Sequence, residues 1–154
     1  GRERYGGRSS ERLERLGESM VKSKGLQHIG ILVPDAEAAA KWYIEKSDFE
    51  KKGEFTAQGS RVIFVYSRDT KVMCELIQRP AGSEEAADVE KHGGRIDHIA
   101  YEAEDLEKEF AHAKEEGMDI IEGIVEVPEF WENGFQYFLV YGAGGEKVEY
   151  CKVL

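Results

Sequence analysis

The stretch Leu26-Gln27-His28-Ile29-Gly30 returns 70 residues later as Ile96-Asp97-His98-Ile99-Ala100. Each stretch has the β-branched and aliphatic content of a strand and is followed by an aspartate suited to cap a helix, Asp35 or Asp105, at the same offset. Self-similarity at a fixed period indicates that one supersecondary unit is used twice. Units this small cannot bury their sheets alone, so we expect them to share one core.

Hydrophobic periodicity extends the repeat to whole modules. Module one (25–80) is predicted to hold a first strand from Gly25, a helix over 36–46, and three strands: Phe49–Thr56, Arg61–Tyr66 and Lys71–Gln78. A linker (81–94) with a helix over Ser83–His92 leads to module two (95–154). There the pattern predicts a first strand from Arg95, a helix from Leu106 that stops at Gly117, and the strands Asp119–Val127, Phe135–Tyr141 and Lys147–Val153. The sequence therefore predicts an α+β fold of two βαβββ modules.

Composition excludes several classes of protein. The 154 residues carry a formal net charge of -10, which disfavours a nucleic-acid partner because phosphate binding needs a basic face. The chain has no apolar run approaching the ~20 residues of a membrane span. Cys74 and Cys151 show no pairing pattern, which favours a reducing compartment and predicts a cytoplasmic protein. Residues 1–24 are interpreted as a tag-derived or flexible extension, the alternative being a helix that docks on the domain.

Four polar residues fall at equivalent positions of the repeat. His28 and His98 lie midway along the first strand of each module, and Glu75 and Glu149 lie midway along the last strand. An ionised carboxylate within an apolar strand is costly unless it is paired or binds a cation. Imidazole and carboxylate ligands suit zinc, nickel, cobalt, manganese or iron. We therefore predict that the four residues hold one divalent metal, with room left for catalysis.

The repeat with these four residues resembles the vicinal oxygen chelate superfamily, which includes glyoxalases, bleomycin-resistance proteins and dioxygenases. The resemblance covers Leu26 to Leu154 and implies a U-shaped mixed sheet around a metal cleft. The order His, Glu, His, Glu is similar to glyoxalase I (lactoylglutathione lyase), as is the segment Trp131-Glu132-Asn133-Gly134. This implies a cytoplasmic metalloenzyme that uses nickel, cobalt or zinc on the hemithioacetal of methylglyoxal or a related 2-oxoaldehyde, with Glu149 as the base and Glu75 as its partner.

The same resemblance implies a homodimer in which His28 and Glu75 of one chain meet His98 and Glu149 of the other. A site within one chain is the alternative arrangement. The partner is expected to be a small molecule, with no nucleic acid and no membrane.

Other positions depart from the glyoxalase pattern and leave the substrate open. Leu32 and Arg79 stand where the resemblance expects a glutathione-binding arginine and asparagine. Methylmalonyl-CoA epimerase is the first alternative, although its separate catalytic glutamate aligns with Ala57 or Gln58. The second is a non-catalytic protein that binds a small hydrophobic molecule or drug. Cys151 shares a strand face with Glu149 and is interpreted as a small buried residue near the site.

Overall fold

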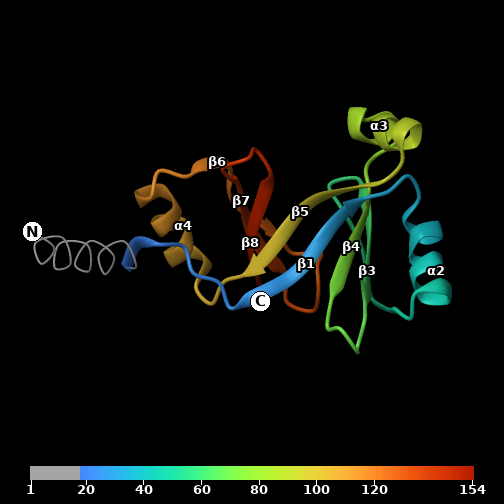
Figure 1. Ribbon diagram of the computed structural model, residues 1–154, viewed down its shortest axis with the longest axis horizontal. Coiled ribbons are helices and arrows are strands. Elements are labelled where there is room, and N and C mark those ends of the chain that lie inside the picture. Colours follow the sequence, from blue (N-terminus) through green and yellow to red (C-terminus); the bar gives the residue numbers. More distant parts are fainter. Residues whose placement is uncertain (1–17) are drawn as a thin grey trace, which may run out of the picture.

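The computed structural model describes residues 18–154, and these form one mixed eight-stranded sheet with three α-helices (Figure 1). The strand order is β2-β3-β4-β1-β5-β8-β7-β6. Module one contributes, in chain order, β1 (Gly25–Leu32), α2 (Ala36–Lys46), β2 (Glu50–Ala57), β3 (Ser60–Tyr66) and β4 (Met73–Gln78). The linker holds α3 (Glu84–His92), and module two contributes β5 (Arg95–Glu102), α4 (Leu106–Glu115), β6 (Asp119–Val127), β7 (Phe135–Tyr141) and β8 (Lys147–Val153).

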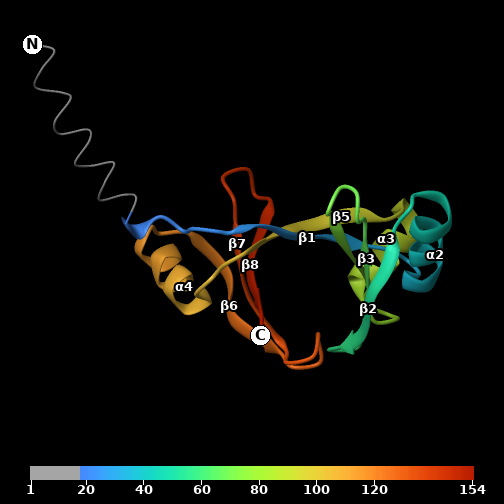
Figure 2. The same cartoon turned by 90° about the horizontal axis from the view of Figure 1, so that it is seen from below.

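The sheet is curled into a half-barrel, as Figure 2 shows. Its base is the antiparallel pair of β1 and β5, one first strand from each module. Each of these strands also pairs in parallel with the last strand of its own module, β4 or β8, and so begins one arm of the U. Helix α2 packs on the outside of β3 and β4, and α4 packs on the outside of β6, β7 and β8. The predicted α+β fold with a U-shaped mixed sheet is confirmed.

The predicted elements agree with the structure apart from small shifts at their ends. The strands β6, β7 and β8 and the helix α2 have the predicted bounds. The strand predicted to begin at Lys71 begins at Met73, because Ser67 to Lys71 form a turn. In that turn Lys71 adopts a left-handed φ of 59° and its amide donates to the Ser67 carbonyl at 2.7 Å. Asp35, Ser83 and Asp105 each cap the helix that follows, by accepting a backbone N–H.

The concave side of the sheet holds a core that both modules share, as the repeat predicted. Its buried side chains are Leu32, Val62, Phe64 and Ile77 from module one, Val89 from the linker, and Ala100, Val127, Phe130, Phe135 and Cys151 from module two. Phe55 on β2 meets Phe130 across the mouth of the U, with ring centroids 5.2 Å apart. Separate clusters lie under α2 and α4 on the convex side. The concave core therefore joins the two arms, whereas each convex cluster attaches a helix to its own arm.

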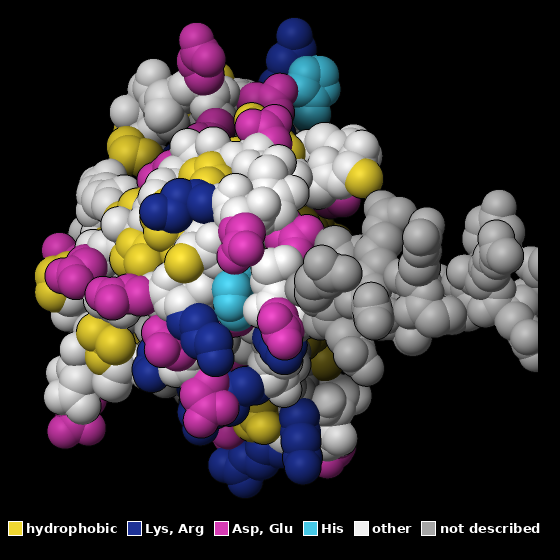
Figure 3. Space-filling model, turned by 90° about the vertical axis from the view of Figure 1, so that its left-hand side faces the viewer, with side chains coloured by type: hydrophobic (Ala, Val, Ile, Leu, Met, Phe, Trp, Pro, Cys, Tyr) yellow, Lys and Arg dark blue, Asp and Glu magenta, His cyan; other side chains and the backbone are white. Residues whose placement is uncertain are grey.

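The structure describes only the last residues of the predicted 1–24 extension. Val21 packs against the cluster under α4, and the Lys22 amide donates to Glu109 at 3.2 Å. Figure 3 shows one face of the molecule, on which acidic and basic side chains are interspersed. None of the described helices is long and apolar enough to cross a membrane.

Candidate metal centre

His28, Glu75, His98 and Glu149 converge on the concave side of the sheet. The Nε2 atoms of the two histidines lie 3.1 Å apart. Glu75 Oε1 lies 3.4 Å from each of these nitrogens. Glu149 presents Oε2 to His28 at 3.4 Å and Oε1 to His98 at 3.5 Å. All four residues are buried. One chain thus brings together the four residues that the repeat pattern singled out.

Strand register explains why the four side chains meet. Gly30 on β1 is paired both with His98 on β5 and with Glu75 on β4. At the equivalent position of module two, Ala100 on β5 is paired both with His28 on β1 and with Glu149 on β8. Small residues therefore occupy the centre of the site. A Cβ atom at Gly30 would collide with the imidazole of His98, so glycine leaves the space that this ring occupies.

Two β-bulges orient the histidines. In the pairing of β1 with β5, the register shifts between Leu26 and His28 and again between Gly30 and Ile31, so Gln27 and Asp97 are left without a paired residue. A bulge bends its strand and redirects side chains, which lets neighbouring residues reach the same side. Accordingly, Gln27 Oε1 contacts His28 Nδ1, and Asp97 Oδ2 lies 2.8 Å from His98 Nδ1. Both imidazoles are thereby turned so that Nε2 faces the centre.

Sequence reasoning did not identify Gln27 and Asp97 as site residues. The available signal was their position, since each immediately precedes a site histidine at the same place in the repeat. An alternating strand would nevertheless have sent both side chains to the opposite face, and only the bulges bring them back.

The pKa values of three of the four site residues are shifted from their usual ranges in different directions. Burial alone raises the pKa of Glu75, but contacts with His28 and His98 outweigh burial and hold that pKa below its usual range. Burial alone lowers the pKa of His98, but the hydrogen bond with Asp97 and the contacts with Glu75 and Glu149 raise it to about 10. For Glu149, burial raises the pKa to about 7 against the opposing effect of the two histidines. Without a bound cation, the four residues (the quartet, His28, Glu75, His98 and Glu149) therefore retain protons near neutral pH.

The residues present fit a divalent metal. Ligand atoms placed about 2.1 Å from one centre lie roughly 3.0–3.4 Å from each other, close to the donor separations seen here. Within the described part of the chain, Glu149 Oε2 is buried and has no hydrogen-bond partner, which leaves it available to a cation. Nδ1 contacts with Gln27 and Asp97 are the outer contacts that metal-bound histidines typically make. Two groups of potential ligand atoms, each within 4.8 Å of one another, share His28: one is completed by Glu75 and His98, the other by Glu149 and Cys151. Together they make the two histidines and two carboxylates a candidate site for a divalent ion.

The structure describes one chain and brings the four residues together within it, while the predicted homodimer stays a prediction. The prediction placed His28 and Glu75 opposite His98 and Glu149 of a partner chain. Instead β1 and β5 pair within one chain, so the two modules face each other and supply all four residues. This is the single-chain alternative that the sequence left open. No second chain is needed to complete the quartet.

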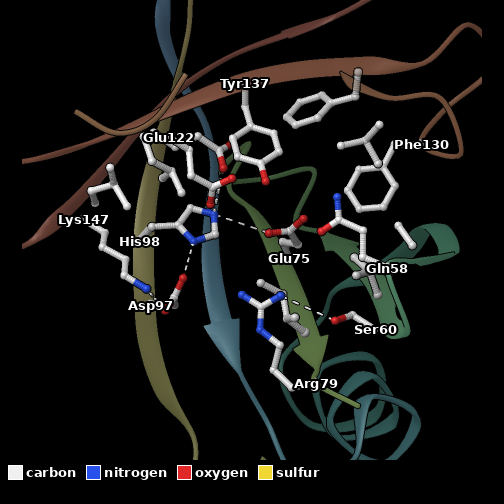
Figure 4. A pocket seen from close by; sticks show the side chains of 18 of the residues that line it. Gln58, Ser60, Glu75, Arg79, Asp97, His98, Glu122, Phe130, Tyr137 and Lys147 are labelled. Atoms are coloured by element: carbon white, nitrogen blue, oxygen red, sulfur yellow. Dashed lines mark hydrogen bonds and ion pairs between the residues drawn. The ribbon is translucent and has the colours of Figure 1, made fainter. Parts of the chain in front are cut away.

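A cavity of about 230 Å³ opens beside the quartet (Figure 4). Phe130, Phe135 and Val127 form part of an apolar wall. Tyr137 points its hydroxyl into the same space, and burial, with Glu122, Glu149 and Glu75 adding to it, raises the pKa of this phenol to about 12. Polar side chains that line the cavity include Gln58, Ser60 and Arg79. The cavity combines an apolar wall with a few polar groups, as small-molecule sites do.

The remaining residues that the sequence singled out divide between the core and the cavity. Leu32 is buried in the shared core, whereas Arg79, Ala57 and Gln58 line the cavity. Cys151 is also part of the core, and its thiol donates to the Tyr101 carbonyl at 3.6 Å. Burial, reinforced by Glu149, raises the pKa of this thiol. Cys74 is buried under α2, and neither cysteine forms a disulfide within residues 18–154.

The fold and the quartet can now be compared with known proteins. The family model of the glyoxalase/bleomycin resistance protein/dioxygenase superfamily matches residues 27–135. The chain belongs to this superfamily. Its matched region begins at Gln27 and includes three residues of the quartet, His28, Glu75 and His98.

Proteins to which the chain is similar include a dioxygenase and an epimerase. The chain is 33% identical over 105 residues to 4-hydroxyphenylpyruvate dioxygenase of Caenorhabditis elegans, a match that covers 64% of this chain but 26% of that protein. The chain thus spans about a quarter of this curated relative. A hypothetical protein of Bacillus halodurans C-125 superposes with a TM-score of 0.70 at 26% identity, covering 86% of this chain and 96% of the other. Methylmalonyl-CoA epimerase of Mycobacterium tuberculosis has the same fold, with a TM-score of 0.72 at 20% identity over 88% and 91% of the two chains.

Proposed function

We propose that this superfamily member is a divalent-metal-dependent isomerase or lyase that moves a proton at the carbon next to a carbonyl group. The observation that carries the proposal is the pair of carboxylates, Glu75 and Glu149, each within 3.5 Å of both histidine Nε2 atoms. Iron-dependent oxygenases typically use two histidines and only one carboxylate. The additional carboxylate here supports proton transfer over oxygen chemistry.

His28, His98, Glu75 and Glu149 would hold the metal. When bound, the metal acts as a Lewis acid that polarises the substrate carbonyl and stabilises negative charge on its oxygen. Gln27 and Asp97 keep the Nε2 atom of each histidine directed at the ion. Phe130 and Phe135 exclude water from one side of the cavity, which strengthens electrostatic interactions inside it.

Glu149 is proposed as the base that takes the proton from the substrate carbon. It comes from β8 in one arm, whereas Glu75 comes from β4 in the other. Glu75 is proposed as its partner: the proton taken by Glu149 is passed to the ionised Glu75, which returns it to the adjacent carbon and so converts a hemithioacetal of methylglyoxal, or of a related 2-oxoaldehyde, into a 2-hydroxyacyl thioester. A positioned general base typically contributes about 10²–10⁴-fold to the rate.

Epimerisation of methylmalonyl-CoA is the second candidate. It is supported by the solved epimerase, whose single chain has the same arrangement of both modules. In this reaction a proton leaves and returns to one carbon, and two carboxylates on opposite arms would serve the two faces of that carbon. Gln58 is the observation against it, because an amide lines the cavity where the epimerase resemblance expects a catalytic glutamate.

An assay of nickel- and zinc-loaded protein tests the proposal. Methylglyoxal is supplied with glutathione, a bacillithiol-type thiol or coenzyme A, and thioester formation is followed. In parallel, methylmalonyl-CoA is incubated in deuterated water, and exchange of its α-proton is measured. Thioester formation supports the lyase, and exchange alone supports the epimerase. Loaded protein that is inert in both assays, or protein that binds less than about a tenth of an equivalent of metal, would favour the non-catalytic binding protein instead.

A further inference from the structure

Arg79 is a cavity residue that the proposed chemistry does not use. It follows β4 directly and shares the strand face of Glu75 and Ile77, because alternate residues of a strand point the same way. Four residues along a strand correspond to about 13 Å between Cα atoms. The long arginine side chain shortens this gap, and Figure 4 shows its guanidinium turned back toward Glu75 and His98.

The guanidinium is only weakly engaged by the described residues. Its Nη1 donates to Ser60 Oγ at 3.5 Å, and its Nε lies 3.5 Å from Glu85 Oε1. Both separations are at the outer limit for such contacts. Nε is buried and has no hydrogen-bond partner among residues 18–154. Such an orphaned donor in a cavity is costly, and a ligand that accepts from it would remove this cost.

The other cation of the cavity is already neutralised. Lys147 Nζ lies 3.3 Å from Asp97 Oδ1, and Asp97 also binds His98. Arg79 is held less closely, because its pairing with Glu85, at 3.5 Å, involves Nε alone. Its guanidinium lines the described cavity wall together with the buried hydroxyl of Ser60 and the amide of Gln58. A planar guanidinium matches the two oxygens of a carboxylate or phosphate.

We infer that Arg79 and Ser60 form an oxyanion subsite, so that the substrate is a small molecule with a carboxylate or phosphate a few bonds from its metal-chelating oxygens. This inference rests on the proposed function, because only a bound cation would offset the negative charge of Glu75 and Glu149 for an anionic ligand. The cavity of about 230 Å³ is also smaller than the roughly 300–1,000 Å³ of sites for drug-sized ligands. A compact anion fills such a space.

Three 2-hydroxy acids test the subsite by calorimetric titration of zinc-loaded protein. Lactate, malate and 3-phosphoglycerate share the chelating pair and differ in a methyl, carboxylate or phosphate tail. We expect malate or 3-phosphoglycerate to bind at least about tenfold more tightly than lactate, as charge-assisted hydrogen bonds allow. The tail that gives the larger gain in affinity over lactate, carboxylate or phosphate, identifies the anion that the subsite prefers. Equal affinity for all three acids, or no binding of any, would overturn the inference.

Variants assign the gain to Arg79. In Arg79→Met the preference for an anionic tail should fall to within about twofold, whereas Arg79→Lys should keep part of it. Arg68→Met is the matched control, because Arg68 is exposed and pairs with Glu50 far from the cavity lining. Arg79→Gln carries the same expectation should Arg79→Met fail to fold. A preference that survives in Arg79→Met and Arg79→Gln rejects the subsite.

Titration of chelator-treated protein separates this inference from the proposed function. If lactate binds equally well without metal, its oxygens do not chelate a metal held by the quartet, which contradicts the proposed function. The ratio of the malate affinity to the lactate affinity still reports on Arg79. Conversely, metal-dependent binding of lactate with no gain from an anionic tail would leave the proposed function standing and reject the subsite.

Discussion

The Nε2 atoms of His28 and His98 lie 3.1 Å apart, although the two residues are separated by 70 positions in the chain. The two nitrogens face each other because the first strands of the two modules pair antiparallel at the base of the half-barrel. Each Nδ1 is occupied on its far side by Gln27 or Asp97, so both Nε2 atoms remain directed at one point. The two imidazoles of the candidate metal centre are thus held in a fixed orientation.

A site formed within one chain should not depend on association. We expect each chain to bind one equivalent of zinc or nickel at concentrations where sedimentation shows only monomer. His98→Ala should lose this metal, whereas His92→Ala should retain it because His92 is exposed on α3. Metal that dissociates when a dimer is diluted to monomer would instead restore the shared arrangement.

Glu149→Gln separates metal binding from proton transfer. An amide keeps an oxygen for the cation but cannot take a proton, so we expect turnover to fall by about 10²–10⁴-fold while part of the metal remains bound. Glu129→Gln provides a control at an exposed position. Steady-state rates and metal content, measured on the same samples, check this. A variant that keeps more than about a tenth of its activity would exclude Glu149 as the base.

Asp97→Asn tests the bulge that orients His98. The carboxylate accepts from His98 Nδ1 at 2.8 Å, and losing such an outer contact typically weakens metal affinity about 10–100-fold. Competition with a chelator of known affinity measures the change. Asp119→Asn, at an exposed position of β6, should leave the affinity unaltered. Equal affinities in both variants would show that the Asp97 contact does not support the ligand.

Gly30→Ala probes the close approach of β1 to His98. The added Cβ would overlap the imidazole, so we expect loss of stability of about 1–3 kcal/mol together with weaker metal binding. Gly123→Ala is the matched control, because a Cβ there would meet only Phe110 Cζ at an ordinary 3.5 Å. Thermal unfolding of both metal-free variants compares the two strand glycines. A Gly30→Ala variant as stable as Gly123→Ala contradicts the packing argument.

Metal affinity should rise with pH. In the metal-free protein, Asp97 and the two glutamates outweigh burial and raise the pKa of His98 to about 10, so a cation must displace this proton at neutral pH. Displacement of one proton raises the apparent affinity about tenfold per pH unit between pH 7 and 9. Below pH 7 the slope should steepen, because burial raises the pKa of Glu149 to about 7 and a second proton is then released. Chelator competition across this pH range measures how the apparent metal affinity depends on pH. An affinity that does not change with pH would contradict the release of protons from His98 and Glu149.

The sequence by itself predicted the modules and the four residues. A repeat that places His28 and Glu75 in one module and His98 and Glu149 in the other requires only that alternate residues of a strand face one way. Because hydrophobic periodicity is local, the bounds of α2, β6, β7 and β8 followed from it as well.

Only the tertiary structure shows the four site residues meeting within one chain. Pairing of β1 with β5 within the chain, and not between two chains, depends on long-range contacts such as Phe55 with Phe130, and a repeat satisfies both arrangements equally. The bulges that turn Gln27 and Asp97 toward the histidines arise from this same pairing. Local periodicity cannot encode them, because a bulge is defined by the strand opposite. The site thus combines residues fixed by local pattern with an orientation fixed by how the two modules pack.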